Sequence, residues 1–210
     1  MTIRSRAFRY FGAGILAALL TAVPAITPAS AAPATPLQPV DKLDVERYLG
    51  TWWQQAAIPG FYSIRCARDT SARYGLIDET TISVDNTCIS STGARDGVRG
   101  RAKVVDPESR AQLSVSFPDV PFSVDPHDRP NYVVAWVASG NDPDGPYEYA
   151  IVGDPDRLSG FILTRDRVIP TSTLLALRSE VSRLGFHTCL FLTSPTTGGR
   201  SDYTPLCRVA

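Results

Sequence analysis

The run Gly50-Thr51-Trp52 constrains this chain most, because it opens a long series of short segments in which apolar and polar residues alternate. A glycine two residues before a tryptophan lets the backbone bend sharply into a strand, and the indole can then fill one end of a closed sheet. Taken alone, the triplet is more simply interpreted as a loop glycine before an ordinary core tryptophan. The segments that follow decide between the two interpretations.

Eight strands are predicted beyond Gly50, because turn residues divide the chain at the short, regular spacing of an all-β barrel or sandwich. In the third of them, Ile82 and Val84 alternate with Ser83 and Asp85, so one face is apolar and the other polar. Eight strands can also close around one small ligand. The strands are expected at 51–58, 66–76, 81–90, 98–105, 111–117, 131–138, 147–153 and 159–165.

Two helices accompany these strands. A short helix is predicted over 43–48, and a longer amphipathic one begins after Pro170 and ends at Gly185. Its apolar positions at helical spacing are Leu174, Leu177, Val181 and Leu184. We expect this helix to pack on the outside of the barrel, with a ninth strand at 188–193. The pattern predicts an all-β fold, a barrel or sandwich of eight strands with one C-terminal helix and a ninth strand.

Residues 1–31 have the three parts of a secretory signal peptide. Three arginines precede an apolar stretch that is short for a membrane span, and the small residues Ala29-Ser30-Ala31 form a cleavage site. No cysteine follows this site and the arginines are not adjacent, so neither a lipid anchor nor a twin-arginine signal is expected. The sequence therefore predicts a secreted, extracytoplasmic protein without a stable membrane anchor.

Without the signal peptide, 18 basic residues remain against 21 acidic ones. This balance gives no electrostatic reason to expect nucleic acid or an anionic membrane as a partner. The proline-rich residues 32–42 are predicted to form an extended arm. Residues 43–210 are predicted to form one barrel domain with a C-terminal extension.

All four cysteines lie in the exported part, where disulfides form and persist. Cys66 with Cys88, and Cys189 with Cys207, each lie symmetrically about a turn-like segment, so each pair would face across the open end of a hairpin. These pairings are favoured, and a bond between Cys66 and Cys207 is the alternative. No metal site is predicted, because no C-x-x-C run or pair of histidines accompanies the thiols.

With these elements in this order, the chain resembles the lipocalin family, in particular its bacterial, apolipoprotein-D-like branch. Gly50-Thr51-Trp52 resembles the first motif of that family. Phe161-Ile162-Leu163-Thr164-Arg165 resembles the last motif, in which an arginine reaches back over the first-motif tryptophan. Between them, residues 72–76 with 82–86 resemble the second hairpin, and residues 149–155 resemble the later strand region. The resemblance covers nearly the whole predicted domain and implies that its fold is an eight-stranded antiparallel up-and-down barrel with one C-terminal helix and a ninth strand.

This resemblance implies a structural role for Gly50, Trp52 and Arg165 at the closed end of the barrel. A guanidinium stacked on an indole is also favourable in itself, by about 1–2 kcal/mol when desolvated, and its donors can satisfy backbone carbonyls of the short helix. Two positions depart from the family. Trp53 stands where tyrosine or another residue is usual, and Phe161 replaces a tryptophan common in this branch.

The resemblance implies a binding protein that holds a small hydrophobic ligand, such as a fatty acid or lipid, in the barrel interior without a cofactor. Aromatic side chains would supply contact area and one amide an orienting hydrogen bond, while ordinary core packing is the alternative at each position. The residues predicted to face the cavity are Tyr74, Asn86, Phe117, Tyr132, Trp136 and Phe161. No catalytic or metal-binding residue is predicted.

Two other functions are weighed against this one. An enzyme would need a reactive thiol or paired acids in the interior; because the cysteines are expected in disulfides and the acids cluster in turns, no enzyme is predicted. A secreted interaction protein or inhibitor would use loops at the barrel mouth. The polar segment 118–130, with Asp119, Asp125, His127 and Asp128, suits such a role, although a plain connecting loop is the simpler interpretation.

Overall fold

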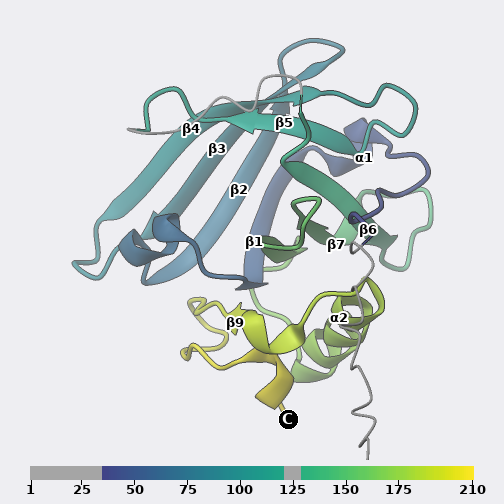
Figure 1. Ribbon diagram of the computed structural model, residues 1–210. Helices are drawn as coiled ribbons and strands as arrows, with labels where there is room; N and C mark the ends of the chain where they lie inside the picture. The colour runs from purple at the N-terminus through teal and green to yellow at the C-terminus, as the bar shows by residue number, and fades with distance from the viewer. Residues whose placement is uncertain (1–34, 121–128) are drawn as a thin grey trace, which may run out of the picture. The chain divides into compact units, whose positions relative to one another are not determined.

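Eight antiparallel strands close into a barrel, against which lie a helix and a short ninth strand (Figure 1). The computed structural model describes residues 35–120 and 129–210. Hydrogen-bonded neighbours follow chain order from β2 to β8, and β1 closes the ring by pairing with both β8 and β2. The predicted up-and-down barrel is confirmed.

The strand bounds follow the alternation of apolar and polar residues. The barrel strands are β1 (Gly50–Ala57), β2 (Arg68–Leu76), β3 (Thr81–Ile89), β4 (Arg95–Val104), β5 (Gln112–Ser116), β6 (Tyr132–Ser139), β7 (Tyr147–Gly153) and β8 (Gly160–Thr164). They agree with the predicted strands except at their ends. β4 begins earlier than predicted, because its first residues pair with the last residues of β3 in a hairpin.

The remaining elements lie before and after the barrel strands or in a connection between them. They are α1 (Val45–Tyr48), the 3-10 helix η1 (Phe61–Arg65), α2 (Thr171–Arg183), the 3-10 helices η2 (Thr188–Leu190) and η3 (Leu206–Arg208), and β9 (Leu192–Thr193). α1 begins at Val45 because the Asp44 carboxylate accepts a hydrogen bond from the Arg47 N–H. The ninth strand is shorter than predicted, since residues 188–190 form η2 instead.

Strand β1 determines which large side chains enter the barrel. Its register with β2 places Trp52 and Trp53 on opposite faces of the sheet. Trp52 is fully buried, whereas Trp53 is half-buried. The turn into β1 needs glycine, because Gly50 has a φ of 97° and an added Cβ would lie 3.2 Å from Arg165 Nη1.

An extended arm, residues 35–44, completes the barrel wall between β5 and β6. These strands share only two residue pairs. The Val40 N–H donates to the Val134 carbonyl on the edge of β6, and Leu37, which is buried, donates its N–H to the Pro155 carbonyl. The arm therefore satisfies one backbone carbonyl on β6 and one just after β7.

The segment that follows β9 completes the wall between β1 and β2. Those strands pair only near the start of β1. Where they diverge, the Ser194 N–H donates to the Gln55 carbonyl, and the Asp69 N–H donates to the Pro195 carbonyl. A segment outside the eight strands thus bridges two of them.

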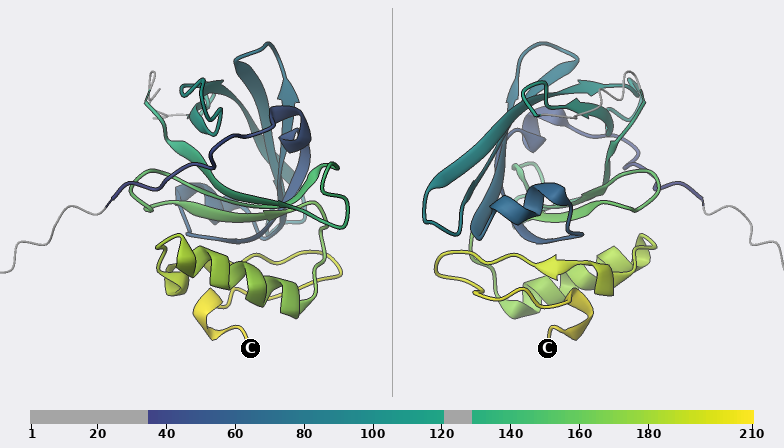
Figure 2. Two further views of the ribbon diagram at one scale, coloured as in Figure 1. Left: turned by 90° about the vertical axis from the view of Figure 1, so that its right-hand side faces the viewer. Right: turned by 60° about the vertical axis from the view of Figure 1, so that its left-hand side comes forward.

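Helix α2 and the C-terminal extension form a layer on the outer face of β6, β7 and β8 (Figure 2). Leu174, Leu177 and Val181 of the helix are buried there, as predicted from their spacing. Leu206 and Val209 of the extension are buried in the same layer. Burial of this apolar surface makes the extension part of the domain core.

Both predicted disulfides are present. Cys66 is bonded to Cys88, which joins the segment before β2 to β3. Cys189 is bonded to Cys207, which joins η2 to η3 rather than the two strands of a regular hairpin. The 22-residue separation of the first pair corresponds to a loss of unfolded-chain entropy worth about 3 kcal/mol.

Two predicted segments lie wholly or largely outside the described residues. They are the signal peptide at 1–31 and the stretch of the polar loop that contains Asp125, His127 and Asp128. Among the helices of the described ranges, none has the length and apolar character needed to cross a membrane.

Candidate functional site

The interior of the barrel is the candidate site, and Trp52 closes one end of it. The Arg165 guanidinium carbon lies 3.9 Å from the centroid of the Trp52 ring. Arg165 also donates to the backbone carbonyls of Arg47, Thr51 and Tyr147. The arginine thus covers the indole, as the family resemblance implied, and ties α1 to the first residues of β1 and β7.

Three tyrosines form the floor above Trp52. The Tyr48 and Tyr132 hydroxyls are hydrogen-bonded at 2.8 Å, and the Tyr132 and Tyr74 hydroxyls at 3.0 Å. The Tyr48 ring packs on Trp52 and on Tyr74, with centroids 5.1 and 5.5 Å apart. The three hydroxyl groups carry three protons, and the two hydrogen bonds between them use two of these protons. One hydroxyl proton is therefore left to donate to a ligand atom.

The tyrosine floor is electrically neutral over the physiological range. Burial raises the pKa of Tyr74 to about 12 and holds the pKa values of Tyr48 and Tyr132 well above their ordinary range. Because desolvation disfavours phenolate, all three groups stay protonated. They can donate or accept hydrogen bonds without presenting charge to a ligand.

We expect the free energy of unfolding to fall as the pH rises from about 10 to about 12, because the unfolded tyrosines ionise near their ordinary pKa while the folded ones do not. Tyr74 alone contributes about 3 kcal/mol, present below pH 10 and lost as the pH rises toward its folded pKa of about 12. Urea unfolding across this range measures the fall. Tyr74→Phe should flatten it, and an unchanged unfolding free energy would contradict a buried neutral floor.

The walls above the floor are mainly apolar. Their buried or partly buried residues include Val84, Ala102, Leu113, Val115, Val134, Val137, Ala150, Val152 and Leu163. Phe117 and Phe161 pack against this cluster near the open end and are half-buried. Phe117 can lie flat on β4 because Gly100 has no side chain; an added Cβ would lie 2.5 Å from the Phe117 ring.

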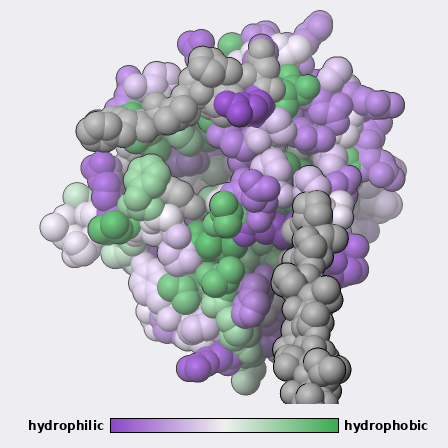
Figure 3. Space-filling view, viewed as in Figure 1, coloured by the Kyte–Doolittle hydropathy of each residue, from purple (hydrophilic) through white to green (hydrophobic). Residues whose placement is uncertain are grey.

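Helix η1 borders the open end of the barrel, where β1 ends and β2 begins. Arg65 of η1 forms an ion pair with Asp96 at 2.8 Å. Phe61 and Ile64 of η1 are 74% and 86% exposed, and Leu158 on the β7–β8 connection is 77% exposed. The mouth therefore combines apolar and charged residues. On the face drawn in Figure 3, hydrophobic side chains gather in the middle and are bordered by hydrophilic ones.

Five of the six residues predicted to line the cavity occupy the inner face. Tyr74, Phe117, Tyr132 and Phe161 belong to the inner cluster or pack against it. Asn86 lies two residues beyond the buried Val84 on β3, so it faces the same side of the sheet. These side chains come from β2, β3, β6, β8 and the residue that follows β5, which the closed sheet brings together.

Trp136 is the exception, because it packs against the outer cluster beneath α2. The register of β6 against β7 shifts between Val134 and Trp136. Such a bulge adds a residue and reverses the side that later side chains face. The prediction of an inward Trp136 was wrong because simple alternation was continued through this shift.

Tyr48 is the floor residue that the sequence prediction missed. It ends α1, four residues before Trp52, and its carbonyl accepts a hydrogen bond from the Trp52 indole N–H. Its aromatic character at the end of the short helix was the available signal. Its contact with Tyr132 could not be inferred, because the two residues are far apart in sequence.

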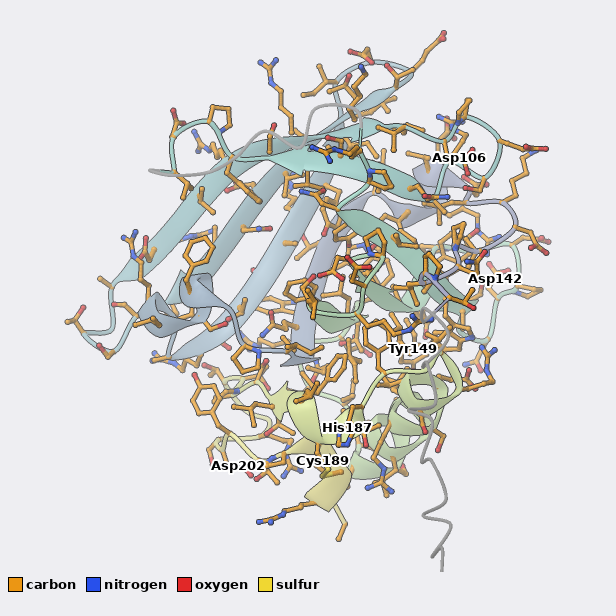
Figure 4. All side chains as sticks on the ribbon, in the orientation of Figure 1. Asp106, Asp142, Tyr149, His187, Cys189 and Asp202 are labelled. Atoms are coloured by element: carbon orange, nitrogen blue, oxygen red, sulfur yellow. A yellow bond between two sulfur atoms is a disulfide. The ribbon has the colours of Figure 1, made fainter. Side chains whose placement is uncertain are left out.

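Several of the described groups that could carry chemistry lie away from the interior cluster. Figure 4 shows Asp106 and Asp142 on loops at the periphery of the barrel, and His187 and Cys189 in the C-terminal layer. All four cysteines are in disulfides. Within the described residues, no group of three or more His, Cys, Asp and Glu side chains is placed to hold a metal ion.

Comparisons with known proteins place this chain among similar sequences and structures. Residues 43–196 match the family described as a lipocalin-like domain. Temperature-induced lipocalin-1 of Arabidopsis thaliana is 32% identical over 151 residues, which cover 71% of this chain and 77% of that protein. The outer membrane lipoprotein Blc of Escherichia coli K12 is 27% identical over 179 residues, or 85% and 93% of the two chains. Insecticyanin of the tobacco hornworm Manduca sexta has a similar structure, with a TM-score of 0.53 at 20% identity over 77% and 84% of the two chains.

Proposed function

Because this chain belongs to the lipocalin family, we propose that it is an exported protein that binds or carries a small hydrophobic or lipid-like ligand in the barrel interior. Proteins of this fold generally bind small hydrophobic ligands.

The observation that carries the proposal is an apolar, partly open inner wall that ends in a neutral hydrogen-bonding floor. Phe117 and Phe161 pack against the inner cluster and are half-buried, whereas Val84, Val134 and Val152 of that cluster are buried. Contact with an acyl chain would remove this apolar surface from water at about 25 cal/mol per Å², less the cost of ordering the ligand. The tyrosine floor offers a hydrogen bond to a carbonyl or carboxyl group.

We further propose that the ligand is bound without chemical change. The thiols that could act as nucleophiles are consumed in disulfides, and the three buried phenols are held neutral by burial, which makes them poor bases and nucleophiles. Mass spectrometry of lipids extracted from natively purified protein, before and after incubation with an added ligand, would detect any product.

The signal peptide predicted over 1–31 supports export, and so do the two disulfides, which persist in oxidising compartments. Amino-terminal sequencing of the protein from the culture medium should find a start at Ala32. A lipoprotein would have a cysteine directly after the cleavage site, and Ala32 stands there instead.

The purified mature protein is expected to bind a fluorescent fatty acid with a dissociation constant of about 1 μM, near −8 kcal/mol. Since the inner wall and floor are uncharged, the methyl ester of the same fatty acid should compete within about threefold of the free acid. Fluorescence titration and displacement measure both values. Loss of competition by the ester would show that a charged contact, and not the apolar wall, holds the ligand.

A further inference from the structure

We propose that the outer face of β1 to β4 carries a binding groove for an extended acidic oligosaccharide, separate from the barrel interior. We call it the outer groove. It contains a hollow of about 400 Å³ with Ser71 and Thr87 at its floor and Trp53, Arg73, Arg95 and Arg167 around them. β1 to β4 lie side by side in Figure 1.

The cross-strand register explains why this face is hollowed. Trp53, Ser71, Thr87 and Gly97 lie opposite one another in a single row across the four strands. Three of these residues are small, and the Ser71 and Thr87 hydroxyls are hydrogen-bonded at 3.1 Å. The row crosses three interstrand steps of about 4.8 Å, so the floor is about 14 Å long.

Arginines flank this row of small residues. Arg73 and Arg99 lie in the neighbouring row, on either side of Asp85. Arg95 lies beyond Thr87 and donates to its hydroxyl at 3.4 Å. A second hollow, of about 610 Å³, shares Asp85, Thr87 and Arg95 with the first and extends past Arg99 to the Arg65–Asp96 ion pair at the barrel mouth. The outer groove therefore continues across β4.

The outer groove has an excess of positive charge, although the whole protein does not. Within the described residues, neither Arg73 nor Arg99 has an ion-pair or hydrogen-bond partner, and both are exposed. Two acids of the groove already have an arginine partner: Asp69 lies 3.5 Å from Arg68, and Asp96 lies 2.8 Å from Arg65. This leaves Asp85 and Asp119 against Arg73, Arg95, Arg99 and Arg167, so an anionic ligand would improve the balance of charge.

The shape and donors of the outer groove select the class of anion. A lone inorganic ion would contact one arginine or two and leave most of the floor empty. An oligosaccharide can cover the length, exchange hydrogen bonds with the Ser71 and Thr87 hydroxyls, and place a ring against the half-buried indole of Trp53. The guanidinium fork pairs with a carboxylate in two parallel hydrogen bonds, which favours uronic-acid units.

Isothermal titration of the mature protein with tetragalacturonate tests this proposal, with maltotetraose as a neutral sugar of equal length and tetrapolyphosphate as an anion without sugar hydroxyls. We expect tetragalacturonate to bind at low salt and to weaken about tenfold or more at 0.5 M salt, because exposed charges are then screened. We expect no measurable maltotetraose binding. Absence of tetragalacturonate binding, or tighter binding of tetrapolyphosphate, would overturn the assignment of an acidic oligosaccharide.

A matched pair of variants locates the site. Arg95→Glu changes an arginine of the outer groove, and Arg101→Glu makes the same change of charge on the same face of β4, outside the two hollows. We expect Arg95→Glu to weaken tetragalacturonate binding at least about tenfold and Arg101→Glu less than about threefold. Equal losses would overturn a specific groove in favour of a diffuse basic surface. Both variants should bind the fluorescent fatty acid as the unmodified protein does, which separates this test from that of the barrel interior.

Discussion

Phe161→Asp is expected to abolish binding of the fluorescent fatty acid. Phe161 belongs to the inner face of β8 and packs against the cluster that lines the barrel. An aspartate there would place a charge in an apolar enclosure, at a desolvation cost of several kcal/mol that the ligand chain cannot offset. Affinity should fall by about 100-fold or more, which fluorescence titration would measure.

The control for this change lies on the adjoining connection. Leu158→Asp adds the same charge three residues earlier, at a side chain that is 77% exposed, and should leave binding within about threefold. Circular dichroism and non-reducing peptide mapping should show that both variants are folded, with both disulfides formed. A folded Phe161→Asp protein that binds the fatty acid normally would show that the ligand does not occupy the barrel.

Trp52→Ala is expected to lower the free energy of unfolding by about 3–5 kcal/mol, because it removes a fully buried ring. The loss extends beyond the ring itself, because two neighbours lose their contact with it. The Arg165 guanidinium carbon lies 3.9 Å from the centroid of the Trp52 ring, and the centroid of the Tyr48 ring lies 5.1 Å from it. Urea unfolding followed by circular dichroism measures the change.

Trp53→Ala is the matched control, because the residue is the same and the neighbouring position faces outward. Its ring is half-buried and has the Arg167 guanidinium 5.4 Å from its centroid, so we expect a loss of about 1–2 kcal/mol. Losses of equal size for the two variants would contradict the placement of Trp52 in the core and Trp53 on the outer face.

The regular part of the fold follows from local patterns. Alternation of side chains indicates strands because successive residues of a strand face opposite sides, and the turn residues between the segments divide the chain. Closure of the barrel was implied by the family resemblance that Gly50, Trp52 and Arg165 carry, and the structure places those residues together. The disulfide pairs were also correctly predicted from their spacing.

The predicted cavity residues were placed correctly only where the strand alternation is uninterrupted. Tyr74 and Asn86 lie in a regular stretch of paired β2 and β3, and both face inward. Trp136 follows a shift in the register of β6, and it packs under α2 instead. A bulge depends on how two strands pair, so the residue sequence of one strand does not reveal it.

By itself, the sequence determined the eight strands, the late helix, the cysteine pairs and the closing tryptophan, because each depends on spacing within one segment or on a motif. Only the tertiary structure decided how distant residues meet: the Tyr48, Tyr74 and Tyr132 hydroxyls in one floor, and the segment after β9 between β1 and β2. The arginines of the outer groove also meet only in the tertiary structure, because the sheet register gathers them from separate strands onto one face. The net charge of the chain does not reveal them, since net charge counts residues without regard to position.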